Sequence, residues 1–301
     1  MVEAQTPVAQ YARQVLKQVG QVFAGKEQTV LWCLAAILAN GHILLEDIPG
    51  VGKTTLAVAL SKVLGLSFGR VQFTSDVMPA DVVGYCVPVG GEMTYKPGPV
   101  MCNLFLADEL NRATSRTQSA LLEAMEEGQV TVDGMSHTLP RPFIVIATQN
   151  PLGGAGTQPL PDNQMDRFAV RLQLGYPAKE DEKKLILQRG GELKPVMAEL
   201  AQMQTEVAAT YVSEAVTDYA VRLMAATRKS FGILRGGSPR ATLSVVAVAK
   251  AWAQLQGRDF VIPEDVQRSF LRCLPHRISV KGDANTWLRR IVRRVRRPEM
   301  R

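Results

Sequence analysis

The feature that most constrains this chain is a short glycine-rich turn between an apolar strand and a helix, at residues 44–55. Such a turn lets backbone N–H groups converge on phosphate oxygens, and a lysine followed by a hydroxyl residue suits a Mg²⁺-nucleotide. The strict pattern G-x-x-x-x-G-K-[ST] is incomplete, because Asp47 stands at its first glycine position. A plain Gly/Pro turn followed by a solvated lysine is the alternative interpretation. The residues predicted to bind ATP are Pro49, Gly50, Val51, Gly52, Lys53, Thr54 and Thr55.

A second apolar run, residues 103–109, ends in two adjacent carboxylates, Asp108 and Glu109. We expect Asp108 and Thr54 to hold Mg²⁺, Asp108 through the water shell of the ion. Glu109 is then placed to orient and deprotonate an attacking water. A carboxylate pair at a strand end is also typical of a solvated loop, but its distance from the phosphate loop suits one intervening strand and helix in a doubly wound sheet.

The pattern between residues 43 and 174 alternates strands with helices, which predicts a parallel α/β domain. Helices at 56–64 and 115–127 and two hairpins, at about 84–98 and 129–139, are expected within it. After residue 175 only helical patterns follow, so the sequence predicts an α/β nucleotide-binding domain over 1–175 and an all-α lid over 176–301. The expected strands are 43–45, 70–73, 104–107, 143–147 and 169–174.

Composition narrows the class of protein. The 301 residues are 46% hydrophobic, enough for one large core or two modest ones. The most apolar helix, Val30–Ala39, is too short for stable membrane insertion, and no signal-peptide pattern opens the chain, so a cytoplasmic location is expected. The four cysteines lack C-x-x-C spacing and are interpreted as free core residues.

The net charge of +7 is concentrated at one end of the chain. Residues 289–301 hold seven arginines and one glutamate, which leaves the rest of the chain at +1. Apolar residues at helical spacing, such as Leu288 and Ile291, predict a packed amphipathic helix with a solvated arginine face. Contact with an acidic partner, a membrane surface or nucleic acid is the alternative. The nearly neutral remainder argues against a basic groove on the folded body.

Three further polar residues follow apolar or turn segments. Asn150 follows the expected strand 143–147 and is suited to touch a γ-phosphate or the attacking water. Arg167 is expected between the sheet and the lid, and Arg240 at the start of a lid helix. With these residues the sequence resembles the AAA+ ATPases, and closely the MoxR family. The stretches that carry the resemblance are 72–81, 108–113, 120–127 and 147–151.

The resemblance implies roles for these residues. Asn150 corresponds to the first sensor, Arg240 to the second sensor, which would couple nucleotide state to the lid angle, and Arg167 to an arginine finger that reaches a neighbour's ATP. Arg112 is the alternative finger, since it follows the carboxylate pair. The two hairpins are similar to the family's helix-2 insert and pre-sensor hairpin.

The resemblance also implies a biochemical function, namely Mg²⁺-dependent ATP hydrolysis in a homo-oligomeric, hexameric ring that remodels or matures other protein complexes. The implied partners are proteins with a von Willebrand factor A domain or metalloenzyme complexes. A nucleic-acid motor or clamp-loader-like ATPase is the alternative. A guanine-reading Asn-Lys-x-Asp motif is absent from the sequence, which argues against a GTPase switch.

Overall fold

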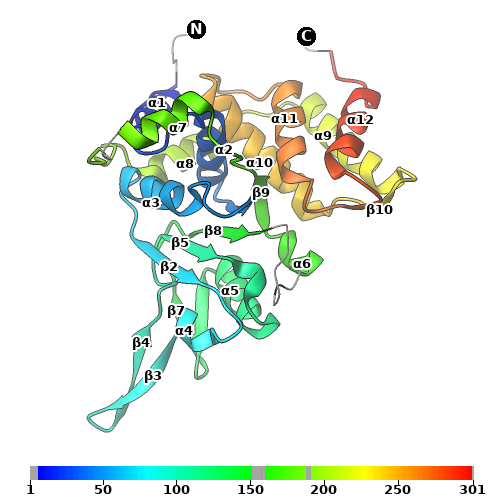
Figure 1. Ribbon diagram of the computed structural model, residues 1–301. Helices are drawn as coiled ribbons and strands as arrows, with labels where there is room; N and C mark the ends of the chain where they lie inside the picture. The colour runs from blue at the N-terminus through cyan, green and yellow to red at the C-terminus, as the bar shows by residue number, and fades with distance from the viewer. Residues whose placement is uncertain (1–5, 151–156, 158–159, 188–190, 300–301) are drawn as a thin grey trace.

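A computed structural model describes residues 6–150, 157, 160–187 and 191–299 of the protein and is built around one parallel sheet (Figure 1). The strand order is β2-β5-β8-β1-β9. The strands are β1 (His42–Glu46), β2 (Phe68–Gln72), β5 (Leu104–Asp108), β8 (Ile144–Gln149) and β9 (Phe168–Leu172). Each lies within two residues of an expected strand at both ends, so the α/β prediction is confirmed.

All pairings in this sheet are parallel, so the carboxyl ends of its strands lie along one edge. Strand β1 lies between β8 and β9, and β5 lies between β2 and β8. The segments after β1, β8 and β5 therefore meet at that edge, with β8 in the middle. These are the phosphate loop, Asn150 and the carboxylate pair.

Alternating residues of β1, β5 and β8 face two helical layers, as expected for a sheet covered on both sides. Ile43 and Leu45 pack with α1, α2 and α3, whereas Leu44 packs in a second core with α4 and α5. Figure 1 shows α1, α2 and α3 on one side of the sheet and α4 and α5 on the other. These helices are α1 (Pro7–Val19), α2 (Glu27–Leu38), α3 (Lys53–Val63), α4 (Pro79–Val83) and α5 (Ser115–Glu127), with a 3-10 turn at Leu110–Arg112 and a short α6 (Asp162–Met165).

The part after residue 175 is helical, but it also contains a short antiparallel pair of strands, β10 (Ile233–Arg235) and β11 (Ser279–Val280). The expectation of helices alone was incomplete here, because strands this short leave too little alternation to recognise. None of the described helices is both long and apolar enough to cross a bilayer. The helices are α7 (Lys179–Leu187), α8 (Leu200–Ala208), α9 (Glu214–Lys229), α10 (Pro239–Leu255), α11 (Pro263–Cys273) and α12 (Ala284–Arg294).

The hydrophobic core continues across the predicted boundary at residue 175. Trp32 of α2 stacks on Trp252 of α10, with ring centroids 3.9 Å apart, and Thr6 donates to the backbone oxygen of Gln254. Helices from both ends of the chain therefore share one core with the sheet. The division into two domains at this residue stays a prediction.

Two hairpins extend from the α/β part, away from the helical part (Figure 1). They are formed by β3 (Gly84–Val89) with β4 (Glu92–Pro97), and by β6 (Gln129–Val132) with β7 (Met135–Thr138). The Tyr95 ring stacks on the His137 ring at 3.7 Å, which joins the two hairpins to each other. Val89 and Met93, near the tip of the first hairpin, are exposed.

Candidate functional site: a phosphate loop with a distant arginine pair

The phosphate loop joins β1 to α3 through two glycines in the left-handed region, Gly50 (φ 84°) and Gly52 (φ 89°). A side chain is disfavoured at both positions. Helix α3 begins at Lys53 without a side-chain cap, so the backbone N–H groups of its first turn, including those of Thr54 and Thr55, are available to an anion. Pro49 and Gly50 are exposed and Val51 is half-buried, so the loop is open to a ligand from outside.

Asp47, which replaces the first glycine of the motif, holds this loop in place. Its Oδ1 accepts the N–H of Ile48 at 2.9 Å, and its Oδ2 accepts the N–H groups of Leu174 and Gly175 at 2.6 Å each. Its backbone is outside the left-handed region, so the position does not require glycine. Asp47 thus ties the phosphate loop to the segment that leaves β9.

The Lys53 ammonium lies against the same loop and donates to the backbone oxygens of Asp47 at 2.6 Å and Ile48 at 3.2 Å. Partial burial lowers the pKa of Lys53, and the nearby carboxylates of Asp47, Asp108 and Glu109 oppose this shift. The sheet thus brings the predicted lysine and both predicted carboxylates close together.

Asp108 is the last residue of β5 and is buried. Its Oδ1 accepts the Thr148 hydroxyl at 2.7 Å, and its Oδ2 pairs with the Arg70 guanidinium at 2.8 Å. Neither partner was predicted, although both lie on strands that neighbour β5. These contacts fix the carboxylate and balance its charge at the carboxyl edge of the sheet.

Glu109 adopts the left-handed conformation, with φ 57° and ψ 43°. A non-glycine residue held there is strained, and such strain is concentrated at functional sites. Its N–H donates to the Thr148 hydroxyl at 2.9 Å, and its Oε2 pairs with Arg112 at 2.9 Å. Arg112, the alternative finger, is therefore bound to the carboxylate of its own chain. Asn150 follows β8 and is half-buried at the same edge.

The residues at this edge fit a Mg²⁺-nucleotide. Free helix N–H groups and a lysine suit phosphates. The Thr54 hydroxyl, on a half-buried residue of the first turn of α3, suits a magnesium shell together with the Asp108 carboxylate.

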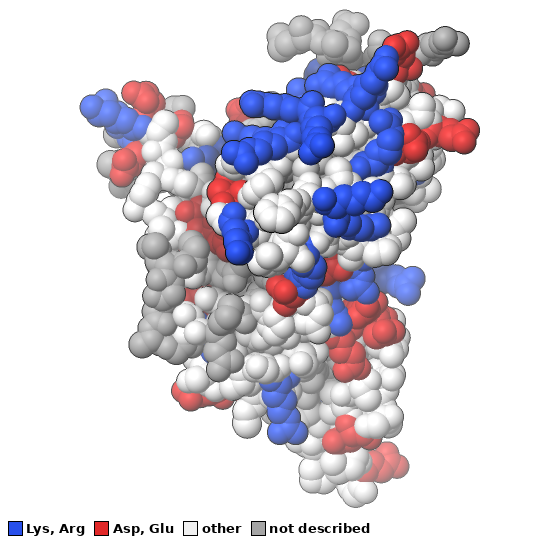
Figure 2. Space-filling view, turned by 90° about the vertical axis from the view of Figure 1, so that its right-hand side faces the viewer, with Lys and Arg blue, Asp and Glu red and all other residues white. Residues whose placement is uncertain are grey.

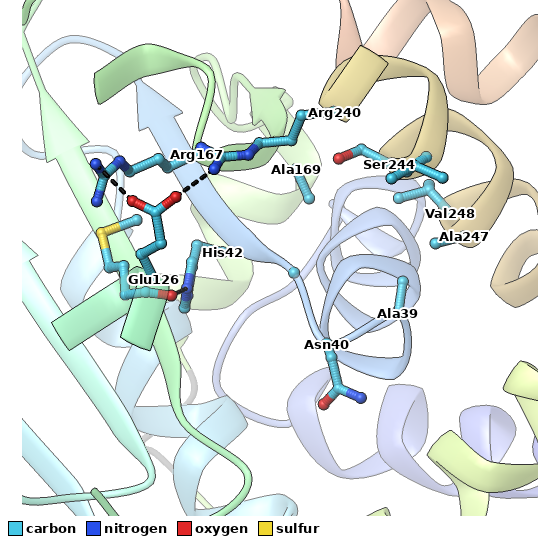
Figure 3. Close-up of a pocket in the computed structure, with 13 residues that line it drawn as sticks. Ala39, Asn40, His42, Glu126, Arg167, Ala169, Arg240, Ser244, Ala247 and Val248 are labelled. Atoms are coloured by element: carbon cyan, nitrogen blue, oxygen red, sulfur yellow. Dashed lines mark hydrogen bonds and ion pairs between the residues drawn. The ribbon is translucent and has the colours of Figure 1, made fainter. Parts of the chain in front are cut away.

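Arg167 and Arg240 lie elsewhere, on either side of Glu126 at the end of α5 (Figure 3). Arg167 pairs with Glu126 at 2.7 Å and donates to the backbone oxygen of Leu122, and Arg240 pairs with the other carboxylate oxygen. These residues line a pocket of about 360 Å³ that also includes His42, the first residue of β1. The arginine pair therefore lies at the amino edge of the sheet, opposite the phosphate loop.

His42 connects the end of α5, which carries Glu126, to the sheet through two hydrogen bonds. Its Nδ1 accepts the N–H of Val145 at 3.0 Å, which leaves Nε2–H to donate to the Met125 backbone oxygen at 3.1 Å. Burial lowers the pKa of His42 to about 4, the Met125 carbonyl opposes that shift, and the charge of Arg167 adds to it. A neutral His42 thus attaches the end of α5, and with it Glu126, to β1.

The start of α10 is tied to the same region through Asp166. This carboxylate accepts the Ser238 hydroxyl at 2.8 Å and pairs with the nearly buried Arg277 at 3.3 Å. Arg277 also donates to the backbone oxygen of Asp166 at 2.8 Å. Ser238 in turn accepts the N–H of Ala241 as the cap of α10. Arg167 and Arg240 therefore belong to one connected surface. The sequence predicted both arginines but not their shared partner.

Residues 42–170 match the ATPase family associated with various cellular activities (AAA), and residues 225–294 match the AAA lid domain. An uncharacterised protein of Bacillus subtilis, YeaC, is 43% identical over 89% of this chain and 87% of its own length. Chaperone MoxR1 of Mycobacterium tuberculosis is 39% identical over 89% of this chain and 75% of its own.

A solved structure agrees with these relatives. The crystal structure of a candidate ATPase from Cytophaga hutchinsonii has a TM-score of 0.89 and 34% identity, and the match covers 97% of this chain and 96% of the other. The matched ranges include the phosphate loop, the carboxylate pair and both arginines. This chain therefore belongs to the MoxR family of AAA ATPases.

Proposed function

We propose that this protein hydrolyses Mg²⁺-ATP at interfaces between copies of itself and uses the energy for chaperone-like remodelling of partner protein complexes. The observation that carries this proposal is the placement of the phosphate loop and the arginine pair at opposite edges of one sheet. Strand β1 separates them by roughly 13 Å of extended backbone, at about 3.3 Å per residue. A second copy is therefore needed to bring Arg167 or Arg240 to a bound nucleotide.

In this mechanism the loop N–H groups and Lys53 bind the phosphates, while Asn150 helps to place the attacking water. Glu109 accepts a proton from that water as its oxygen bonds to the γ-phosphorus and the bond to the ADP oxygen breaks. Thr54 and Asp108 would hold Mg²⁺, which neutralises phosphate charge when bound. Arg70 and Thr148 keep the Asp108 carboxylate in position for this role.

Arg167 of a neighbouring copy would stabilise the charge of the transition state. An arginine supplied in this way is worth about 10³–10⁵ in rate in related phosphoryl-transfer enzymes. Arg240 would act beside it, since Glu126 holds both. This arrangement joins the lid to a neighbour's nucleotide, so nucleotide state would change the lid angle across the interface. Arg112 is the weaker choice of finger because it already pairs with Glu109 of its own chain.

Hydrolysis would then move the hairpins that extend from the α/β part. The Tyr95–His137 stack couples them, and the exposed Val89 and Met93 offer an apolar tip to a client. A hexameric ring, partners with a von Willebrand factor A domain and metalloenzyme clients in the cytoplasm belong to this proposal. The relative named Chaperone MoxR1 supports the chaperone role.

Subunit mixing tests the composite site. Glu109→Gln damages the nucleotide side of a subunit, and Arg167→Ala damages the arginine side. A mixture of the two variants contains some intact interfaces, so we expect ATPase activity above that of either alone, and the same recovery with Arg240→Ala. A mixture of Glu109→Gln with Lys53→Ala is the matched control, because both changes damage the same side and no intact interface forms. Absence of recovery at every ratio of the first mixture would refute an arginine supplied by a neighbour.

The client class needs a separate measurement. Glu109→Gln is expected to bind ATP without turning it over, so the trapped protein can be purified from its native lysate and its partners identified by mass spectrometry. Recovery of a von Willebrand A-domain protein or a metalloenzyme would support the chaperone role. Nuclease-sensitive recovery of DNA-handling proteins would favour a nucleic-acid motor instead.

A further inference from the structure

A second pocket, of about 310 Å³, lies where α2 meets α10, α11 and α12, and none of its lining residues belongs to the nucleotide site. Its lining includes two tryptophans, Trp32 and Trp252, and three arginines, Arg268, Arg272 and Arg289. Figure 2 shows basic side chains gathered on the upper part of one face, where α12 lies. The predicted arginine face of the C-terminal helix thus borders a cavity.

The tryptophans form a closed floor. Their rings are stacked at 10°, and both residues are almost completely buried. The Arg272 guanidinium lies 5.7 Å from the centre of the Trp32 ring. Because both rings are almost completely buried, a ligand cannot stack on them. The tryptophans therefore supply an apolar floor, and the polar contacts to a ligand come from the other lining residues.

The charges around this floor all have the same sign. Within the part of the chain that the structure describes, Arg268, Arg272 and Arg289 form no ion pair with a carboxylate, and no acidic residue lines the pocket. Burial lowers the pKa of Arg272, and the charge of Arg289 lowers it further. All three arginines are exposed, and like charges around one pocket without a counter-ion attract an anion.

From these contacts we infer that the pocket binds a phosphate or pyrophosphate group of a small phosphorylated molecule. Guanidinium groups match the geometry of phosphate oxygens. The amides of Gln28 and Asn285, which also line the pocket, supply further N–H donors. The volume lies at the lower end of the range for ligand pockets, which suits a small molecule.

A ligand in this pocket would contact helices from both parts of the chain. Gln28 and Trp32 come from the part before residue 175, whereas the arginines come from helices after it. A bound anion would therefore hold α11 and α12 against α2. This binding is independent of the proposed ATPase mechanism and is measured without it.

The test is calorimetric titration of the Lys53→Ala chain with inorganic pyrophosphate, because that substitution removes competing binding at the phosphate loop. We expect one saturable site, weakened at least tenfold by adding Arg289→Gln. Adding Arg290→Gln instead is the matched control, since Arg290 is the next residue of α12 and lies over the Trp287 ring, outside the pocket. The affinity of this control for pyrophosphate should stay within twofold of that of the Lys53→Ala chain. Absence of saturable binding, or equal weakening by both substitutions, would overturn the inference.

A second measurement separates a small ligand from a polymer. Pyrophosphate should raise the melting temperature of the Lys53→Ala chain clearly more than that of the Lys53→Ala, Arg289→Gln chain at the same concentration. A short single-stranded oligonucleotide is titrated in parallel. If it binds and Arg293→Gln weakens it as much as Arg289→Gln does, the arginines form an extended nucleic-acid surface and the small-ligand inference is wrong.

Discussion

Asp47→Asn tests whether the carboxylate at the missing glycine position organises the phosphate loop. The carboxylate accepts three backbone N–H groups, one from Ile48 on Oδ1 and two from Leu174 and Gly175 on Oδ2. Asparagine offers one acceptor oxygen in place of two, and its amide NH₂ then faces an N–H group. At least one charge-assisted bond is lost, and a buried donor is left without an acceptor.

The size of the effect follows from those losses. A hydrogen bond to a charged group contributes about 1.5–3 kcal/mol, and an unsatisfied buried donor costs about 1–3 kcal/mol. Since Ile48 is half-buried and water can reach part of it, we expect the free energy of unfolding to fall by about 2–4 kcal/mol. The KM for ATP should rise as well, because the same loop carries the carbonyl groups that hold Lys53.

Urea unfolding and ATP titration measure the two effects. Asp81→Asn is the matched control, since Asp81 accepts a single N–H, from Met78, at an exposed helix start. Asp47→Gly restores the strict motif yet removes every acceptor, so it should bind ATP more weakly than the natural chain. The reasoning is refuted if Asp47→Asn costs no more stability than Asp81→Asn, or if Asp47→Gly improves ATP binding.

Three other predictions concern separate parts of the molecule. Lys53→Ala should abolish measurable ATP binding in a nucleotide titration, and unchanged affinity would contradict its role. Glu126→Gln should lower kcat of the assembled protein with little change in KM, because the arginines lose their shared partner. The exposed neighbour Glu127→Gln should have no effect, and equal loss in both variants would exclude a positioning role. The folded state lowers the pKa of His42 to about 4, so it disfavours protonation of this side chain. The free energy of unfolding should therefore decline by about 3 kcal/mol as pH falls from 6.5 to about 4. Urea unfolding at several pH values should show that the free energy of unfolding changes less with pH in His42→Gln than in the natural chain over that range. An identical pH dependence would exclude His42 as the titrating group.

Local patterns predicted the nucleotide edge of the fold. A glycine turn before a helix and two carboxylates after an apolar strand are each visible within about ten residues, because backbone geometry and strand burial dictate them. The parallel sheet then brings such segments together without further information. Asp47 shows the limit of a pattern, because the motif marks that position as a defect and only the fold reveals the N–H groups of Leu174 and Gly175 around it.

The arginine edge depends on contacts that no local pattern encodes. Arg240 and its partner Glu126 are 114 residues apart, and Trp32 and Trp252 meet from opposite ends of the chain. The exposed side of α5 gave no sign that Glu126 would bind two arginines. The core shared by the N-terminal helices and the lid was missed for the same reason, since burial alone does not identify the partner of an apolar face.

The fold itself explains why one chain is not a complete catalyst in this proposal. Strand β1 begins at His42, beneath the arginine pair, and ends just before Asp47 and the phosphate loop. A paired central strand cannot shorten, so motion within the chain cannot bring its two ends together. Glu126 meanwhile keeps both arginines on one surface. In this proposal the sheet that assembles the binding residues would also direct the arginines toward another molecule, so rapid hydrolysis would require assembly.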